Sequence, residues 1–557
     1  MQKNILEILK INFALVFTAI VVGLIVSIVA QFFSLIAKNV FNLIQSEHSL
    51  TFFPLIACMI AGLFIALLIK FFGVRRWHGP ADTIYAAHQK AGTLDIKSGF
   101  LSTIAAFFSI SGGASVGIYG PLVHFGGTLG AFLRRRSFIP DIPHEIIIGS
   151  GVAAAISAGF SSPLAGIIFA HEVILRHFSM RALTAISLAS VSASFLAKWL
   201  NLVEPTLKFD EISFELIHSI PGLIIVGFMS GIIAFIFMKS LLFFTKQANK
   251  IDLPFYYKPL FPALLCGICG IFFPEVIGLG SETIKSVIIE NNTLLFLFML
   301  LTLKIILTSL CIGFGMFGGV LSPALLIGSC VGAMIYYVPL LGINENLSQI
   351  LAVSGMAAVA SSVIGGPITA VVLVLELTGS YQYAIASIFS VAISNLFTYM
   401  IFGSSFFDAQ LKLRGINIGF GREYIYMNDI LIKNLIDRNC LLFDRNILIN
   451  DALKLFKSKN VTEGYFKDET GKFAGKLKVI NIFDKKNAKA ILYKEKKVIK
   501  LKPDNTLVES IEILSDFVGE SIPVVDEKNF ILGTISENDI LKSYDQIAKD
   551  IKSIEKS

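Results

Sequence analysis

The chain has 557 residues, of which 54% are hydrophobic and 16% charged; its formal net charge is +7 and its mean hydropathy is +0.73. This composition excludes an ordinary soluble domain. The positive charge does not indicate nucleic-acid binding, because the loop lysines and arginines of a membrane protein account for it. Residues 11–415 are mostly long apolar runs and residues 420–557 are rich in Lys, Glu and Asp, which predicts a polytopic membrane domain followed by a soluble tail.

In chain order, residues 12–45 and 50–73 are predicted to form two long membrane helices. The first apolar run is longer than a signal-peptide core, so we expect it to be retained. Basic and aromatic residues at 75–78 mark a membrane edge. Gly79-Pro80 then breaks the chain, a short helix is expected from residue 81, and residues 98–111 form another apolar run.

A glycine-rich motif follows and occurs twice. Its shared residues, each repeated 202 positions later, are Gly117, Pro121, Gly126 and Gly130 in the first copy and Gly319, Pro323, Gly328 and Gly332 in the second. In both copies a glycine-rich turn, with a proline near the first helical position, opens an apolar helix. Such a helix start presents unpaired N–H groups and the positive end of the helix dipole, so two of them together could hold an anion.

Two further matches indicate an internal duplication. Gly151, Pro163 and Glu172 match Gly355, Pro367 and Glu376 at an offset of 204, and residues 82–84 match 282–284 at an offset of 200. Several apolar segments are interrupted by Gly or Pro in both halves. Paired interruptions of this kind indicate a transport site lined by broken helices. The pattern alone leaves open whether the repeats are parallel or inverted.

These motifs give residues 1–415 a resemblance to the CLC family of chloride channels and chloride/proton antiporters. Residues 117–121 resemble the family's GxEGP, 318–323 its GGxFxP, 160–172 its helix that ends in a carboxylate, and 405–408 its serine-isoleucine-tyrosine-aspartate motif. The resemblance implies an all-α membrane domain of two inverted repeats with tilted and broken helices. It also implies a homodimer in the lipid bilayer with one anion pathway in each subunit, in the plasma (inner) membrane with both termini cytoplasmic.

The sequence departs from the family at the residues that carry protons. Coupled members have a glutamate at the third position of GxEGP, where this chain has Tyr119, and many have a second glutamate where this chain has Val173. A phenol is neutral at pH 7 and valine does not ionise. We therefore expect Tyr119 to act as a gate without proton coupling; the alternative is that Tyr119 is a packed aromatic plug.

The anion ligands that the resemblance implies are also altered. Backbone N–H groups remain at Val320 and Leu321, and at Ile118 and Tyr119 of the first helix start, because any residue except proline supplies them. Phe407 stands at the position of a ligand tyrosine and offers no hydroxyl. His78 aligns with a ligand serine and is expected either to donate a hydrogen bond to the anion or to anchor the chain at the membrane interface.

Other polar residues in the apolar segments have structural interpretations. Glu172 and Glu376 occupy matching positions, which predicts a shared role such as accepting hydrogen bonds from helix starts. His124 and His171 are expected to be interior histidines, and the cysteines, including Cys266 and Cys269, to be small packing residues. No metal site is predicted.

The tail resembles a pair of CBS domains. We expect a linker at 416–427, a degenerate first copy at 428–486 and a clear second copy at 487–557, together forming a small α/β domain. Ser536 and Asp539 fit the signature that holds phosphate and ribose in nucleotide-binding CBS pairs. The tail is expected either to bind an adenine nucleotide at this half-site or to serve as a dimer-stabilising scaffold.

The expected function is passive, voltage- or gradient-driven chloride conduction, with no enzyme activity and no required cofactor. One alternative is a chloride/proton antiporter that uses a substitute proton carrier such as His78 or His124. The other is a non-conducting membrane sensor whose tail binds a nucleotide.

Overall fold

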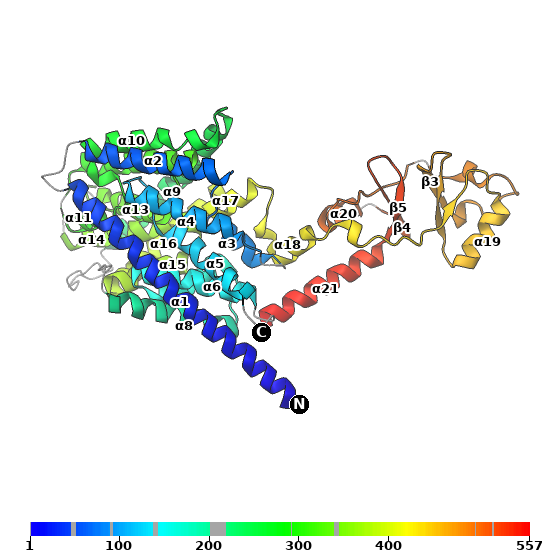
Figure 1. Ribbon diagram of the computed structural model, residues 1–557, viewed down its shortest axis with the longest axis horizontal. Coiled ribbons are helices and arrows are strands. Elements are labelled where there is room, and N and C mark those ends of the chain that lie inside the picture. The colour runs from blue at the N-terminus through cyan, green and yellow to red at the C-terminus, as the bar shows by residue number, and fades with distance from the viewer. Residues whose placement is uncertain are drawn as a thin grey trace. The chain divides into compact units, whose positions relative to one another are not determined.

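The computed structural model describes residues 2–45, 52–89, 93–136, 143–200, 219–290, 292–338, 345–495, 497–514 and 517–556. The chain divides into two compact units, Met1–Ile416 and Asn417–Ser557. The first unit is built of helices, coloured blue to yellow in Figure 1, and the second combines helices with short strands, coloured yellow to red.

The helices of the first unit form two successive sets. The first set is α1 (Gln2–Gln45), α2 (Phe53–Phe72), α3 (Pro80–His88), α4 (Ile96–Ser111), α5 (Tyr119–Arg136), α6 (His144–Phe160), α7 (Pro163–Phe169), the π-helical turn η1 (Ala170–Leu175) and α8 (Met180–Leu200). The second set is α9 (Ile220–Lys250), α10 (Leu260–Phe272), α11 (Ser281–Ile289), α12 (Leu294–Phe314), α13 (Leu321–Ile335), α14 (Glu345–Ile364), α15 (Pro367–Thr378) and α16 (Tyr381–Phe402). Short 3₁₀ turns η3 (Phe255–Tyr257) and η4 (Pro274–Val276) connect elements within the second set, and α17 (Phe406–Lys412) follows it.

Local sequence accounts for where these helices begin and end. Pro54, Pro80 and Pro163 stand in the first turns of α2, α3 and α7, where a missing N–H costs nothing. Gly73 and Gly315 end α2 and α12 in the left-handed conformation that glycine adopts without strain. The helices α1, α2 and α4 confirm the predicted segments at 12–45, 50–73 and 98–111.

Within the described residues, eight helices are long and apolar enough to span a membrane, and five shorter apolar helices accompany them. The helices α2 and α10, which occupy corresponding places in the two sets, pack side by side (Figure 1). Large apolar side chains such as Phe195 and Leu396 are exposed on the outside of the helical unit, as a bilayer requires.

Glycine contacts show that the two sets are repeats. A Cβ built on Gly126 of α5 would lie 2.1 Å from the carbonyl oxygen of Gly151 in α6, and one on Gly328 of α13 would lie 2.2 Å from that of Gly355 in α14. Each glycine pair therefore lets two helix backbones touch. An antiparallel bridge between Gly117 and Gly319 joins the two repeats. This reciprocal pairing is the contact pattern of a two-fold relation, and the inverted-repeat fold that we predicted is confirmed.

The second unit is a small α/β domain, as predicted. Its elements are η6 (Ile418–Phe420), α18 (Gly421–Asp429), η7 (Ile432–Asn434), β1 (Leu442–Phe443), α19 (Ile449–Lys459), β2 (Glu463–Lys467), β3 (Phe473–Lys478), η8 (Val479–Asn481), η9 (Ala490–Tyr493), α20 (Leu507–Leu514), β4 (Ser521–Val525), β5 (Ile531–Ser536) and α21 (Glu537–Lys556). The strand β2 pairs in parallel with β1 and antiparallel with β3, while β4 and β5 form a separate antiparallel pair.

Three apolar clusters stabilise the described part of this unit, the smallest formed by Tyr465, Phe473 and Val525. Another includes Phe443, Phe456 and Phe466. The third includes Ile522 and Ile535, and residues at 426 and 432 also belong to it. Residues 421–427 of the segment expected as a linker, 416–427, belong to the helix α18, which packs against α20 and α21.

Candidate functional site

The two broken helices α5 and α13 begin at the same place. The Gly117 amide donates to the Gly319 carbonyl at 2.8 Å, and the Gly319 amide donates back at 2.6 Å. Glycine is needed here because the backbones touch: a Cβ on Gly319 would lie 2.6 Å from the Gly120 nitrogen. Two helix starts, one from each repeat, are thereby fixed against each other.

The unpaired amides at this junction suit an anion. The first N–H groups of a helix have no intrahelical acceptor. Here Leu122 and Ala324 are the first amides to bond back along α5 and α13, to Ile118 and Val320. Among the described residues, no backbone carbonyl accepts from the amides of 119–120 or 321–322. These donors and the positive ends of two helix dipoles therefore converge where the sequence predicted the anion.

Three of the residues at these helix starts have apolar, buried side chains. Ile118, Val320 and Leu321 are 1%, 4% and 6% exposed. Their side chains belong to the protein core, so any contact that these residues make with an anion is through the backbone.

A third helix start, that of α3, packs against the same junction. A Cβ on Gly120 would lie 3.7 Å from Pro80 Cγ, and one on Gly79 would lie 3.5 Å from Phe317 Cζ. The Trp77 indole donates to the Gly315 carbonyl at 2.8 Å, which ties the segment before α3 to the end of α12.

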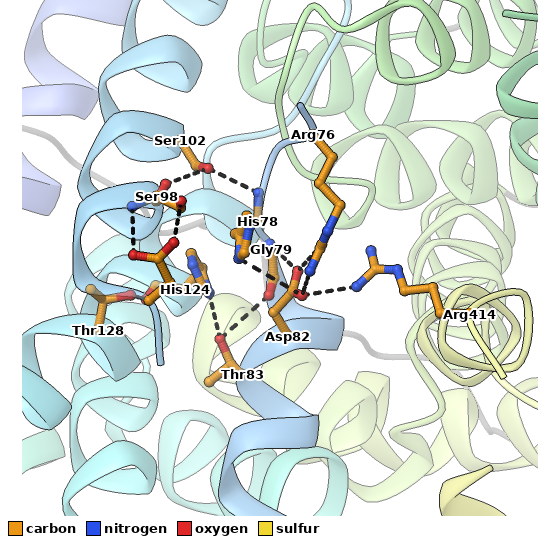
Figure 2. A network of polar contacts seen from close by, with 11 residues as sticks. Arg76, His78, Gly79, Asp82, Thr83, Ser98, Ser102, His124, Thr128 and Arg414 are labelled. Atoms are coloured by element: carbon orange, nitrogen blue, oxygen red, sulfur yellow. Dashed lines mark hydrogen bonds and ion pairs between the residues drawn. The ribbon is translucent and has the colours of Figure 1, made fainter. Parts of the chain in front are cut away.

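Beside this third start, Asp82 accepts four hydrogen bonds (Figure 2). Arg76 donates to both of its oxygens at 2.7 and 3.2 Å, Arg414 donates at 2.8 Å and the Gly79 amide at 3.0 Å. The carboxylate caps α3 and meets two guanidinium groups, so this cluster carries excess positive charge.

His78 lies at the edge of this cluster. Its Nδ1 is 3.9 Å from Asp82 Oδ1, its backbone amide donates to Ser102 Oγ at 2.9 Å, and its ring centroid is 6.1 Å from that of His124 (Figure 2). The Thr83 hydroxyl is 2.8 Å from His124 Nδ1. His124 is fully buried, and its Nε2 has no partner among the described residues.

Tyr119, the first residue of α5, packs on the end of α6. Its ring stacks on Phe160 with 3.6 Å between centroids, and its hydroxyl donates to the Gly159 carbonyl at 3.3 Å. A Cβ on Gly159 would lie 2.4 Å from Tyr119 Cε1, so the glycine makes room for the ring. Tyr119 is held by aromatic stacking and one hydrogen bond.

The remaining predicted membrane residues are buried and apolar. Phe407 is 4% exposed in α17, which packs on α3. Val173 is 2% exposed in η1, and a Cβ on Gly366 would lie 2.9 Å from its Cγ2. Neither side chain offers a hydroxyl or a titratable group.

In the tail, Ser536 and Asp539 bond to each other. Asp539 accepts from the Ser536 hydroxyl at 2.6 Å and from its amide at 3.1 Å, and the Asp539 amide donates to Ser536 Oγ at 3.2 Å. This reciprocal capping box begins α21.

The tail has a second polar centre at residues 463–476. Lys476 Nζ is 2.7 Å from Glu463 Oε2, and Ser521 of β4 donates its amide to Glu463 at 2.8 Å. Burial lowers the pKa of Lys476, and burial raises the pKa of the neighbouring Tyr465 phenol.

The sequence did not predict that Arg414 contacts Asp82, or that Phe160, the first residue of the 160–172 motif, contacts Tyr119. Each lies in a different element from the residue it contacts, and no local pattern links Arg414 to Asp82 or Phe160 to Tyr119. Among the described residues there is no group of three His, Cys, Asp or Glu side chains that could hold a metal.

Comparison with known proteins matches both units to families. The family model described as "Voltage gated chloride channel" matches residues 61–399, and the CBS domain model matches residues 490–545.

Curated relatives are distant in sequence. The chain is 24% identical over 524 residues to "Chloride channel protein CLC-f" of Arabidopsis thaliana, covering 90% of this chain and 63% of that protein. It is 26% identical over 325 residues to "H(+)/Cl(-) exchange transporter ClcA" of Yersinia pestis bv. Antiqua (strain Angola), covering 55% of this chain and 66% of that protein. The chain thus spans less than two thirds of the length of these two relatives.

Solved structures share the fold. A slow cyanobacterial Cl⁻/H⁺ antiporter matches with a TM-score of 0.63 at 19% identity, covering 72% of this chain and 97% of that chain. A eukaryotic CLC transporter matches with a TM-score of 0.64 at 15% identity, covering 96% and 98%. At these identities the likeness extends to the architecture alone.

Proposed function

Since this chain belongs to the voltage-gated chloride channel family, or CLC family, we propose that it conducts chloride passively across a membrane, without coupling to protons. The observation that carries the proposal is the Gly117–Gly319 bridge, which holds two sets of unpaired helix-start amides together. A hydrogen bond to a charged group contributes about 1.5–3 kcal/mol beyond the water contact that it replaces, so several such donors favour a small anion at this place. Voltage or the chloride gradient would supply the driving force.

The absence of proton coupling follows from the two residues at the family's proton-carrying positions. Tyr119 is neutral at pH 7 and its hydroxyl is engaged with Gly159, while Val173 cannot ionise. In this proposal Tyr119 is the gate, and anion passage depends on whether its ring leaves Phe160.

The relatives' printed functions span both possibilities. The Yersinia ClcA is described as an H(+)/Cl(-) exchange transporter, and a 24% identical Escherichia coli protein is described as a voltage-gated ClC-type chloride channel, ClcB. A coupled alternative is favoured by one observation: His78, His124 and Asp82 form a line of titratable groups beside the third helix start. In that alternative the histidines would replace the missing glutamates.

The remaining parts of the proposal come from the family. The protein would form a homodimer in the plasma (inner) membrane, with a pathway in each subunit and both termini cytoplasmic. The tail would bind an adenine nucleotide through Ser536 and Asp539, or would act as a scaffold. No catalytic reaction is part of the proposal.

Chloride efflux from proteoliposomes tests this function. Potassium and valinomycin set the voltage while external chloride and pH are recorded together. Efflux without proton movement is expected. Chloride-driven proton uptake against its gradient would replace the proposal with the coupled alternative, and His124→Ala would then be expected to remove that uptake. No efflux from the wild type together with rapid efflux from Tyr119→Ala would make Tyr119 a closed plug.

A further inference from the structure

The hydroxyl of Ser322 is buried at the junction of the two helix starts. Ser322 lies in the first turn of α13 and is 4% exposed. Among the residues that the structure describes, none forms a hydrogen bond with its Oγ. A buried hydroxyl without a partner is costly, so its position calls for an explanation.

The hydroxyl is directed toward the opposite repeat. A Cβ built on Gly117 would lie 2.7 Å from Ser322 Oγ and 3.0 Å from the Gly319 carbonyl oxygen. Ser322 Oγ therefore lies between the start of its own helix and the turn that precedes α5. Among the described residues, no backbone carbonyl accepts from the amides of 119–120 and 321–322, which belong to these same two helix starts.

Among the described residues, Ser322 does not make the hydrogen bond that serines inside helices usually make. Serines inside helices usually donate to a carbonyl three or four residues earlier, as Ser329 of the same helix does to Leu326 at 2.8 Å. For Ser322 the residues three and four positions earlier are Gly319 and Gly318, which precede the helix, and among the described residues neither carbonyl accepts from its hydroxyl. Five other buried serine hydroxyls also lack a partner in the described chain, at Ser109, Ser111, Ser230, Ser309 and Ser354; Ser322 differs from them in its place beside Gly117, where the two helix starts meet.

We infer that the Ser322 hydroxyl is a side-chain ligand of the transported anion. This inference rests on the proposed function. The resemblance implied a serine and a tyrosine as hydroxyl ligands, but this chain has His78 and Phe407 at those positions. The Ser322 hydroxyl supplies a hydroxyl donor that those two residues lack. It donates its proton to the anion while the helix-start amides of 119–120 and 321–322 donate from the backbone.

A hydroxyl donor at this point also sets anion preference. Small anions such as chloride hold water strongly and need donors to replace it, whereas thiocyanate is larger and is dehydrated more easily. Ser322 therefore favours chloride over thiocyanate. Removing the hydroxyl should shift the preference toward the larger anion.

The test compares Ser322→Ala with Ser329→Ala in the purified full-length protein. Ser329 lies in the same helix, is fully buried and has its own carbonyl acceptor, which makes it a matched control. Chloride affinity is measured by titration calorimetry, and chloride and thiocyanate fluxes are measured in proteoliposomes. Ser322→Ala should weaken chloride binding about tenfold and raise thiocyanate flux relative to chloride, since one hydrogen bond to an ion is lost.

Ser322→Thr keeps the hydroxyl and should retain chloride affinity near that of the wild type, which separates loss of the donor from damage to the fold. Equal chloride affinity and equal anion preference in Ser322→Ala and Ser329→Ala would overturn the role of Ser322 while leaving passive conduction intact. A wild-type protein that neither binds nor conducts chloride would overturn the proposed function itself, and the inference with it.

Discussion

Glu172 and Glu376 each cap the helix start that precedes the other. Glu172 accepts from the amides of Ile368 and Thr369 at 2.9 and 2.8 Å and from the Thr369 hydroxyl at 2.6 Å. Glu376 accepts from the amides of Leu164 and Ala165 at 2.9 and 2.8 Å. The carboxylate at the end of each repeat thus satisfies the orphan donors at the start of α15 or α7, which is the shared structural role that their matching positions predicted.

Removing either carboxylate should destabilise the membrane unit. We expect Glu172→Ala and Glu376→Ala each to cost about 2 kcal/mol, because two helix-start amides lose their acceptor, with Glu172→Ala costing more since it also loses the Thr369 hydroxyl bond. The thermal unfolding midpoint in detergent measures this. Glu282→Ala is the control, because its pairing with Lys285 is exposed and contributes little. Equal midpoints for all three variants would contradict the prediction.

Gly159 should control Tyr119 through contact alone. A methyl group at 159 would occupy the place of the Tyr119 ring, so Gly159→Ala should displace the ring from Phe160 and change chloride flux several-fold, in the same direction as Tyr119→Ala. The double variant should then match Tyr119→Ala to within about twofold, because coupled neighbours are not additive. Independent, multiplicative effects on flux in proteoliposomes would show that Gly159 acts elsewhere.

The buried ion pair of the tail should be sensitive to losing one partner. The side chains of Lys476 and Glu463 are 2% and 4% exposed. Glu463→Gln leaves the ammonium without its counter-charge and should cost about 3 kcal/mol, whereas Glu463→Gln combined with Lys476→Met should cost less. Urea-dependent pulse proteolysis of the tail in the intact protein measures both. A double variant less stable than Glu463→Gln would contradict this account.

Lys476 also predicts a dependence of tail stability on pH. Burial lowers its pKa, so the folded tail holds this proton less tightly than the unfolded chain. Its contribution to stability is therefore complete above the ordinary lysine pKa and is lost as the pH falls through the lowered one. The same proteolysis assay should show stability rising over this alkaline interval in the wild type. Lys476→Met should lack that rise, and an unchanged slope in Lys476→Met would assign the titration to another group.

Nucleotide binding by the tail makes a separate prediction. If the half-site is competent, millimolar ATP should protect the tail from proteolysis by an amount that grows with concentration, because only the folded form binds. Asp539→Ala should remove this protection and should also lose part of the α21 cap, about 1 kcal/mol, without ATP. Protection by ATP that survives in Asp539→Ala would place the nucleotide elsewhere, and no protection in the wild type would leave the scaffold role.

Repetition in the sequence made the two repeats and their broken helices predictable. Glycine and proline at constant offsets located both broken helices, since close backbone approach and helix starts require those residue types. Repetition also predicted that Glu172 and Glu376 cap helix starts, because two carboxylates at matched positions in apolar helices need matched hydrogen-bond donors.

Contacts between side chains on different elements were not predictable in this way. The sequence placed Trp77 at a membrane edge, yet it is 9% exposed and its indole bonds to Gly315 inside the protein. Arg414, more than three hundred residues from Asp82, completes the cluster around that carboxylate. Such pairings depend on how the repeats fold onto each other, and a single sequence carries no periodic signal for them.

The bridge between Gly117 and Gly319 has a consequence for synthesis. The two residues stand 202 positions apart, so at roughly 5–20 residues per second the ribosome makes the second about 10–40 s after the first. During that interval the first half lacks the second helix start, and Glu172 lacks the α15 amides from which it accepts hydrogen bonds. A nascent chain halted between the halves would be a substrate for membrane quality control.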